Sequence, residues 1–341
     1  MTTQTRLSHG PPPPRVLRSR QDTLRVPLPR SPEPEPLRHH FQRLEDVFSR
    51  EEPRRHAYKY VCWLLSRRVP PGGEDGRNRL LTTARWDENQ VRDRVRDLVA
   101  GQLASRGTSL VVAEEGFVKK GSSSAGVSRQ YCAASRRVDN CQIGVFLLSR
   151  DALGNTMAID RELLIPPRWG DGPVARRHAD VPDTSHGVSR EEVALAMIGR
   201  ALDSGMPARR VVADAPFYGD SAAFRRALER RRVPYVLASS RSGPLVSQRT
   251  APDGYVHWQF ARREGGSYLC YVPAHTDLGD CARVAAATDL CVRSHFASAR
   301  QEAGLDRYSA RKWRAWYRHM TLAMFAHAVL RIDAARPLSP C

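Results

Sequence analysis

The sequence predicts an α/β fold, in which a mixed β-sheet is flanked by helices and preceded by a small helical region. Two observations predict it. From Ser109 onward, short β-prone apolar runs bounded by Gly, Asn and Pro alternate with segments that are apolar at helical spacing. Before that point, apolar positions recur at helical spacing alone. We therefore place the α/β domain at residues 106–332 and the helical region at 41–105.

The N-terminal segment, residues 1–40, contains PPPP and PLPRSPEPEP together with several arginines. Such a segment cannot bury a core, so we expect a disordered arm rich in Pro and Arg. The helical pattern begins at Phe41, is interrupted by the loop PPGGEDG, and continues in an amphipathic helix at residues 86–103. Residues 333–341 form a short tail.

The elements of the α/β domain alternate along the chain. Helices are expected at 190–205 and 222–233, and again from Asp280 to the end of the domain. HWQFARR and SYLCYVP, separated by Glu-Gly-Gly, predict a β-hairpin. Further strands are expected at residues 110–113, 141–149, 159–165, within 209–221 and at 234–240.

The charge balance points to a polyanionic partner. The 341 residues carry a formal net charge of +18, supplied mainly by arginine. DNA suits that balance, because Arg and Lys contacts to phosphates supply affinity that does not depend on sequence. An arginine-rich proteome would give the same composition, and composition alone does not separate the two interpretations.

Several classes of protein are disfavoured by composition. No run approaches the ~20 apolar residues of a membrane span, so we expect no membrane partner. The first residues hold no apolar signal segment, which favours a cytoplasmic location. Seven cysteines are scattered without a CxxC pair, so neither a zinc site nor a disulfide framework is predicted, and free thiols are expected.

Acidic residues follow two of the expected strands. Asp214 follows the run Val211-Val212, at the carboxyl end of a strand, where α/β sheets place ligands. Glu114 and Glu115 follow LVVA and precede a Lys-Lys-Gly loop. Two carboxylates beside a basic loop are what a metal-dependent phosphodiester enzyme would need. An ordinary solvated turn has the same residues, so both interpretations stay open.

Three separated blocks of sequence resemble the insertion-sequence transposases of the DDE superfamily. GFVKKGSSSAGVSRQY and NCQIGVFL are similar to the branch that reads DETGF-x-KKG, GV-RQY and NCQ-GV; VVADAPFYGDS and GLDRYSARKWRAWYRHMTLAM resemble its later blocks. The resemblance covers residues 41–332. It implies an RNase H-like fold, an endonuclease that cleaves and transfers DNA strands, and three acidic residues that hold two Mg²⁺ ions. In that family the N-terminal region binds DNA, so residues 41–105 are interpreted as a remnant of such a domain.

The first acidic position of the family is substituted here. Alignment on Gly116-Phe117 puts Ala113 where the family has its first Asp, with Glu114 and Glu115 beside it. On a strand, successive side chains face opposite sides, so Glu114 should point away from where Ala113 points. A loop after Val112 would relax that rule and let a Glu swing in, and so Glu114 and Glu115 stay candidate catalytic residues.

The second position is kept and the third is substituted. Asp214 matches the second Asp, whereas Arg293 and Ser294 fall where the family has a pair of Glu residues. Asp214 is therefore the one family ligand left for Mg²⁺, which predicts weak metal binding or none.

The resulting functional hypothesis is a transposase-family DNA-binding protein, related to DDE DNA recombinases, whose strand-transfer activity is impaired or lost, as in a pseudoenzyme. Two alternatives stay open. One is a still-active metal-dependent endonuclease that uses Asp214, Glu114 or Glu115 and a substitute such as Asp289. The other is a domesticated, non-catalytic DNA-binding regulator.

The expected partner is DNA, either transposon ends or DNA of any sequence, bound in a bacterial, nucleoid-associated setting by a possible homodimer. Basic residues interleaved with Tyr308, Trp313, Trp316 and Tyr317 suggest phosphate contacts combined with base stacking, although those rings equally suit a helix core. The candidate DNA-binding residues are Lys119, Lys120, Arg129, Arg300, Arg307, Arg311, Lys312 and Arg314.

Overall fold

The computed structural model describes residues 34–66, 74–103, 108–169, 173–185, 187–243, 245–308 and 311–335. Most of the expected arm and most of the tail lie outside these residues. Residues 34–40, which we assigned to the arm, instead form most of a helix whose Leu37 is buried. Among the described residues, no helix combines the length and the apolar character needed to cross a membrane.

The helical region precedes the sheet as expected. Its helices are α1 (Pro34–Gln42), α2 (Glu51–Leu65), α3 (Glu74–Thr82) and α4 (Glu88–Leu103), with a 3₁₀ turn, η1, at Glu45–Val47. The later helices are α5 (Pro173–Ala179), α6 (Arg190–Asp203), α7 (Pro216–Asp220), α8 (Ala222–Arg230), α9 (Leu278–Ala303) and α10 (Trp313–Ala334), with 3₁₀ turns η2 (Pro167–Trp169) and η3 (Asp183–Ser185).

The strands of the described residues form one mixed sheet of nine, in the order β2-β3-β1-β5-β6-β9-β8-β7, with β4 also paired to β3. This confirms the predicted α/β class and the predicted hairpin, which is β8 and β9. The strands β2 and β7 were not predicted. The bounds are β1 (Ser109–Val118), β2 (Ser128–Cys132), β3 (Arg137–Arg150), β4 (Thr156–Leu163), β5 (Arg210–Ala213), β6 (Tyr235–Ser239), β7 (Val246–Thr250), β8 (Tyr255–Ala261) and β9 (Ser267–Pro273).

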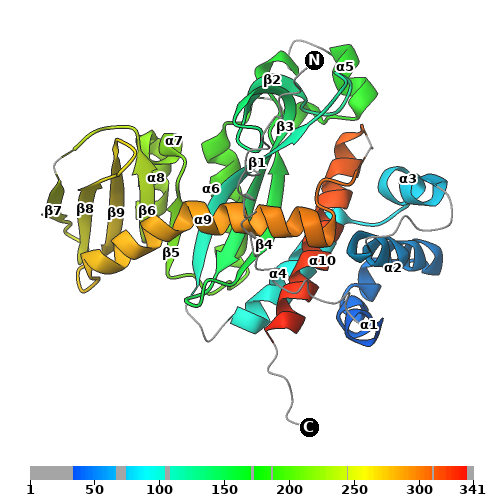
Figure 1. Ribbon diagram of the computed structural model, residues 1–341, viewed down its shortest axis with the longest axis horizontal. Helices are drawn as coiled ribbons and strands as arrows, with labels where there is room; N and C mark the ends of the chain where they lie inside the picture. Colours follow the sequence, from blue (N-terminus) through cyan, green and yellow to red (C-terminus); the bar gives the residue numbers. More distant parts are fainter. Residues whose placement is uncertain are drawn as a thin grey trace, which may run out of the picture. The chain divides into compact units, whose positions relative to one another are not determined.

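The two faces of the sheet are covered by different helices. The long helix α9 runs across one face and packs against β1, β5 and β6 (Figure 1). The helices α6, α7 and α8 lie on the other face, where α6 packs against β3 and α7 against β6. Side chains that alternate along a central strand therefore meet either α9 or the α6–α8 layer.

Helix α10 lies at the centre of the helical layer, where it packs against α2, α3, α4, α9 and β4. It is buried almost all round, as expected for a helix without a polar face. Trp316, one of the rings considered for base stacking, is fully buried in this core, and Tyr308 and Tyr317 are buried as well. Those three rings therefore pack inside the protein and cannot stack on DNA bases.

A buried arginine of α10 ties the helical region to the sheet domain. The guanidinium of Arg318, 1% exposed, donates to the carbonyls of Leu80 and Leu81 at distances of 3.3 and 3.2 Å, near the end of α3. It also donates to the carbonyls of Ala84 and Trp86, at 2.8 and 3.0 Å. Since the last carbonyls of a helix have no partner within it, Arg318 acts as a cap for α3.

Glu88, at the start of α4, receives two arginines from α10. Its carboxylate lies 3.2 Å from Nε of Arg318 and 3.1 Å from Nε of Arg314. The Arg318 side chain is buried, whereas that of Arg314 is 55% exposed. The two ion pairs therefore share one carboxylate and differ in solvent access, which makes them a matched pair for measurement.

We predict that Arg318→Leu destabilises the protein by about 3–5 kcal/mol, because it leaves a buried carboxylate and several buried carbonyls without their donor. Arg314→Ala, which removes the exposed partner of the same carboxylate, should cost at most about 1 kcal/mol. Urea denaturation of both variants measures the difference. Equal losses would show that Arg318 does not anchor α3.

Candidate active site

The parallel pairing of β1 with β5 places the candidate residues together. Val112 lies opposite Ala213, so Ala113 and Asp214 follow side by side at the point where β5 ends and β1 continues. A cavity of about 560 Å³ opens at this point. Its lining includes Ala113, Glu114, Glu115, Arg190, Asp214, Phe217, Tyr218, Asp289 and Val292.

Glu114 and Glu115 both line the cavity and face opposite sides of the sheet. Strand β1 continues to Val118, beyond the end that we expected, and stays paired with β3 over its whole length. No loop therefore relaxes the alternation of side chains. Ala113, which the resemblance aligns with the family's first Asp, supplies no carboxylate, and its neighbour Glu114 faces the opposite side of the sheet.

Glu114 faces α6 and α7. Its Oε1 lies 3.0 Å from Nε of Arg190, the first residue of α6, whose guanidinium sits 5.3 Å from the centre of the Phe217 ring. Burial raises the pKa of Glu114 above its ordinary value, and Arg190 and the Tyr218 hydroxyl oppose this by favouring the ionised form. Glu114 is thus a largely buried carboxyl, 18% exposed, that is paired with the guanidinium of Arg190.

Glu115 faces α9. It forms an ion pair with Arg300, and its side chain is only 7% exposed. Burial lowers the pKa of Arg300. Arg300, one of the candidate DNA-binding residues, therefore lies against the sheet and neutralises a buried carboxylate.

Asp214 is held from the far side by the β8–β9 hairpin. The Tyr268 hydroxyl donates to its Oδ1 at 3.0 Å, and Arg262 Nη2 lies 3.4 Å from its Oδ2. Burial raises the pKa of Asp214, Arg262 and Tyr268 lower it, and the negative charge of Asp289 raises it. Asp289 is therefore near enough to Asp214 to act on its charge.

The residues that α9 turns towards the cavity are Asp289 and Val292. Arg293 and Ser294, which the resemblance aligns with the family's third acidic position, are both exposed and do not line the cavity. Arg293 instead forms an ion pair with Asp289, one turn earlier on the same helix.

Each carboxylate of the cavity has an arginine of its own. The four pairs are Glu114–Arg190, Glu115–Arg300, Asp214–Arg262 and Asp289–Arg293. Mg²⁺ requires near-octahedral oxygen ligands and is usually bound through carboxylates left free for it. Within the described ranges, no group of three or more His, Cys, Asp or Glu side chains has the arrangement of a metal site. These residues do not fit the two-metal site that the resemblance implies.

The other candidate DNA-binding residues divide into two groups. Four are engaged with the protein: Lys119 lies 3.6 Å from the centre of the Tyr308 ring, Arg307 donates to the Ser66 carbonyl, Lys312 pairs with Asp180, and Arg314 pairs with Glu88. Burial lowers the pKa of Lys119 to about 8. The remaining three, Lys120, Arg129 and Arg311, are exposed and form no ion pair with any described residue.

Three residues that sequence reasoning did not single out hold carboxylates of this cavity: Arg190, Arg262 and Tyr268. Arg190 sits in the sequence Ser-Arg-Glu-Glu, where Ser189 and Glu192 form a capping box, so the start of α6 could be predicted but its proximity to β1 could not. Arg262 and Tyr268 flank the turn of the β8–β9 hairpin, and only the sheet order brings that hairpin next to Asp214.

We predict that Glu114→Gln raises the midpoint of thermal unfolding at pH 7 and leaves it unchanged at pH 4. A carboxyl whose folded-state pKa is raised loses stability as pH rises from the unfolded-state pKa through the folded-state one. Glutamine resembles the protonated acid, so the two proteins should match at low pH and diverge above it. Calorimetry at both pH values, with Glu52→Gln as the control at an exposed carboxyl, tests this. A variant that melts lower at pH 7 would contradict it.

Comparison with known proteins gives a family and a structural likeness. The family model described as "DDE superfamily endonuclease" matches residues 61–288. The fold is similar to that of the piggyBac transposase in the cryo-EM structure of its synaptic complex with hairpin DNA, with 12% sequence identity and a TM-score of 0.43. That likeness covers 83% of this chain and 65% of the other. No curated protein matches the sequence.

Proposed function

Because the chain belongs to the DDE superfamily of endonucleases, we propose that it is a transposase-type DNA-binding protein whose metal-dependent strand cleavage and transfer are impaired or lost. One observation carries this proposal: each of the four carboxylates that line the cavity is paired with its own arginine. The proposal is further supported by Ala113, which has no carboxylate at the position that the resemblance aligns with the family's first Asp.

The ion pairs oppose metal binding energetically. A divalent cation that recruited Glu115 would have to displace Arg300 from a side chain that is 7% exposed. Separating the partners of a buried ion pair costs about 3–5 kcal/mol. The Asp214 pair is more accessible, but Asp214 alone leaves a metal without the first and third acidic ligands of the family. The arginines therefore supply, as fixed positive charges, the charge compensation that metal ions supply in the family.

Binding to DNA is supported by the three exposed cations near the cavity. Lys120 and Arg129 flank the Gly/Ser-rich loop that follows β1, and Arg129 belongs to β2. The backbone of Arg311 joins the same loop, because Ala125 N–H donates to the Arg311 carbonyl at 2.9 Å. Cations from two distant segments thus gather at one loop, a suitable surface for a phosphate backbone.

We predict that the triple variant Lys120→Ala, Arg129→Ala, Arg311→Ala weakens binding to duplex DNA of arbitrary sequence and lowers the slope of log K against log salt by about 2.7, the value for three lost phosphate contacts. Fluorescence anisotropy over a salt series measures the slope. The matched control removes three arginines that already have acidic partners, Arg94, Arg231 and Arg283. An equal decrease in the control would indicate only a loss of general charge.

We predict that DNA binding is the same in Mg²⁺ and in chelator, that Asp214→Ala leaves the affinity unchanged, and that the unmodified chain does not cleave DNA with Mg²⁺ or Mn²⁺. These outcomes also fit the domesticated regulator. The observation that favours the active alternative is the proximity of Asp289 to Asp214. Metal-dependent cleavage that disappears in both Asp214→Ala and Asp289→Ala would establish that alternative and refute ours.

A further inference from the structure

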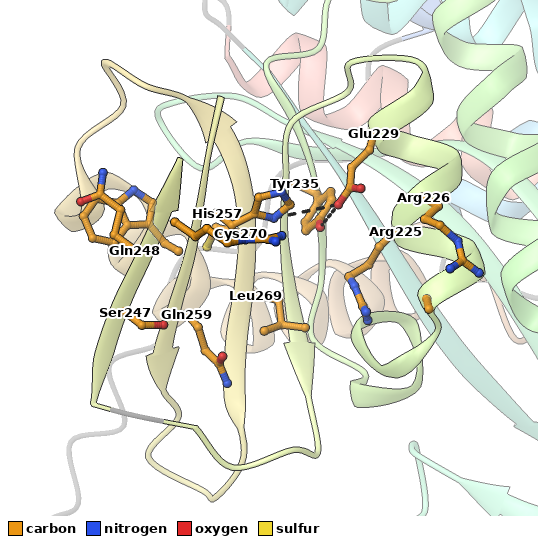
Figure 2. Close-up of a pocket in the computed structure, with 13 residues that line it drawn as sticks. Arg225, Arg226, Glu229, Tyr235, Ser247, Gln248, His257, Gln259, Leu269 and Cys270 are labelled. Carbon is orange, nitrogen blue, oxygen red and sulfur yellow. Dashed lines mark hydrogen bonds and ion pairs between the residues drawn. The ribbon is translucent and has the colours of Figure 1, made fainter. Parts of the chain in front are cut away.

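A second cavity lies towards the end of the sheet that is formed by β7. Beyond β6 the sheet continues through β9, β8 and β7, and α9 packs on one face of this extension through Cys281 and Ala285. On the other face, α8 forms one wall of a cavity of about 520 Å³ whose floor consists of β6, β9, β8 and β7 (Figure 2). The cavity shares no lining residue with the one at Asp214.

The floor of this groove carries rings around a fixed carboxylate. The Tyr235 hydroxyl donates to Oε1 of Glu229 at 2.7 Å, and Nδ1 of His257 lies 4.0 Å from the same oxygen. Figure 2 shows His257 and Tyr235 directed towards Glu229, with Leu269 further along the floor. Burial lowers the pKa of His257, with Arg249 acting in the same direction, so a neutral imidazole faces the groove.

The walls of the groove carry more positive than negative charge. Arg225 and Arg226 project from α8 on one side, and Arg249 comes from β7 on the other. Arg225 donates to the Gly219 carbonyl. Arg226 and Arg249 are exposed and have no ion-pair partner within the described part of the chain. Three guanidiniums against the single carboxylate of Glu229 suit an anionic ligand.

The dimensions favour one strand of nucleic acid over a duplex. From β6 to β7 there are three interstrand spacings, or about 14 Å between strand axes. A single strand can lie between such walls with its bases on the floor, whereas a duplex can reach only the rims. Cations that follow a backbone, combined with rings on a sheet surface, are the general means by which proteins hold single strands.

We infer that this groove binds a single strand of DNA, with phosphates held by Arg226 and Arg249 on its two walls and bases resting on His257 and Leu269. The choice of DNA as the polymer rests on the proposed function. The site itself is separate from the Asp214 cavity and from the loop that carries Lys120, Arg129 and Arg311.

The test uses the full chain and two probes of one sequence, a labelled single-stranded oligodeoxynucleotide and its duplex. Arg226→Ala with Arg249→Ala should weaken single-strand binding roughly tenfold and lower its salt slope by about 1.4, the value for two lost phosphate contacts. Duplex affinity should stay unchanged. The control, Arg94→Ala with Arg283→Ala, removes the same charge at arginines outside the groove.

A second variant separates stacking from charge. His257→Ala should weaken single-strand binding by roughly fivefold or more without changing the salt slope, because one stacked base contributes at least about 1 kcal/mol. His275→Ala, at an exposed residue outside the groove, should have no effect. Unchanged far-UV circular dichroism confirms that each variant is folded.

The outcomes separate this inference from the proposed function. Loss of single-strand binding alone supports the groove. The inference is overturned if none of the three groove substitutions changes the affinity for the single strand while duplex binding persists. That result would leave the proposed function intact. Equal losses for both probes would also overturn it, since the groove would then serve a duplex. A chain that binds neither probe refutes both.

Discussion

The arrangement of the cavity depends on the pairing of β1 between β3 and β5. Parallel pairing with β5 sets Val112 opposite Ala213 and so brings Ala113 beside Asp214. Antiparallel pairing with β3 continues without a break to Val118 and fixes the alternation of the side chains in between. As a result the two consecutive glutamates of β1 cannot face the same helix, and Ala113, beside Asp214, supplies no carboxylate to the cavity.

The positive and negative charges of the cavity that these strands form balance one another. Carboxylates that would repel one another are each compensated by a guanidinium from a different part of the fold: the start of α6, the last turn of α9 or the β8–β9 hairpin. Burial makes those charges costly, and the arginines offset that cost. Such a site needs no metal to balance the charge of its carboxylates.

Local patterns carried the prediction of the fold. The position of Asp214 at a strand end and the β8–β9 hairpin both follow from short runs of sequence, and both are confirmed. The partners of charged residues do not follow from such runs. Arg318 meets the carbonyl of Leu80, 238 residues away, and Arg300 meets Glu115. From the sequence we therefore predicted DNA contacts for several cations, among them Arg300. In the structure these cations neutralise charges or bind carbonyls inside the protein.

The claim that arginines have replaced the metals in this cavity is tested most directly by calorimetric titration of the metal-free chain with Mn²⁺ in the absence of DNA. We expect no saturable binding at millimolar Mn²⁺, because each carboxylate that a cation would need is held by Arg190, Arg300, Arg262 or Arg293. Saturable binding that is lost in Asp214→Ala would contradict this account and would show that the cavity still holds a metal.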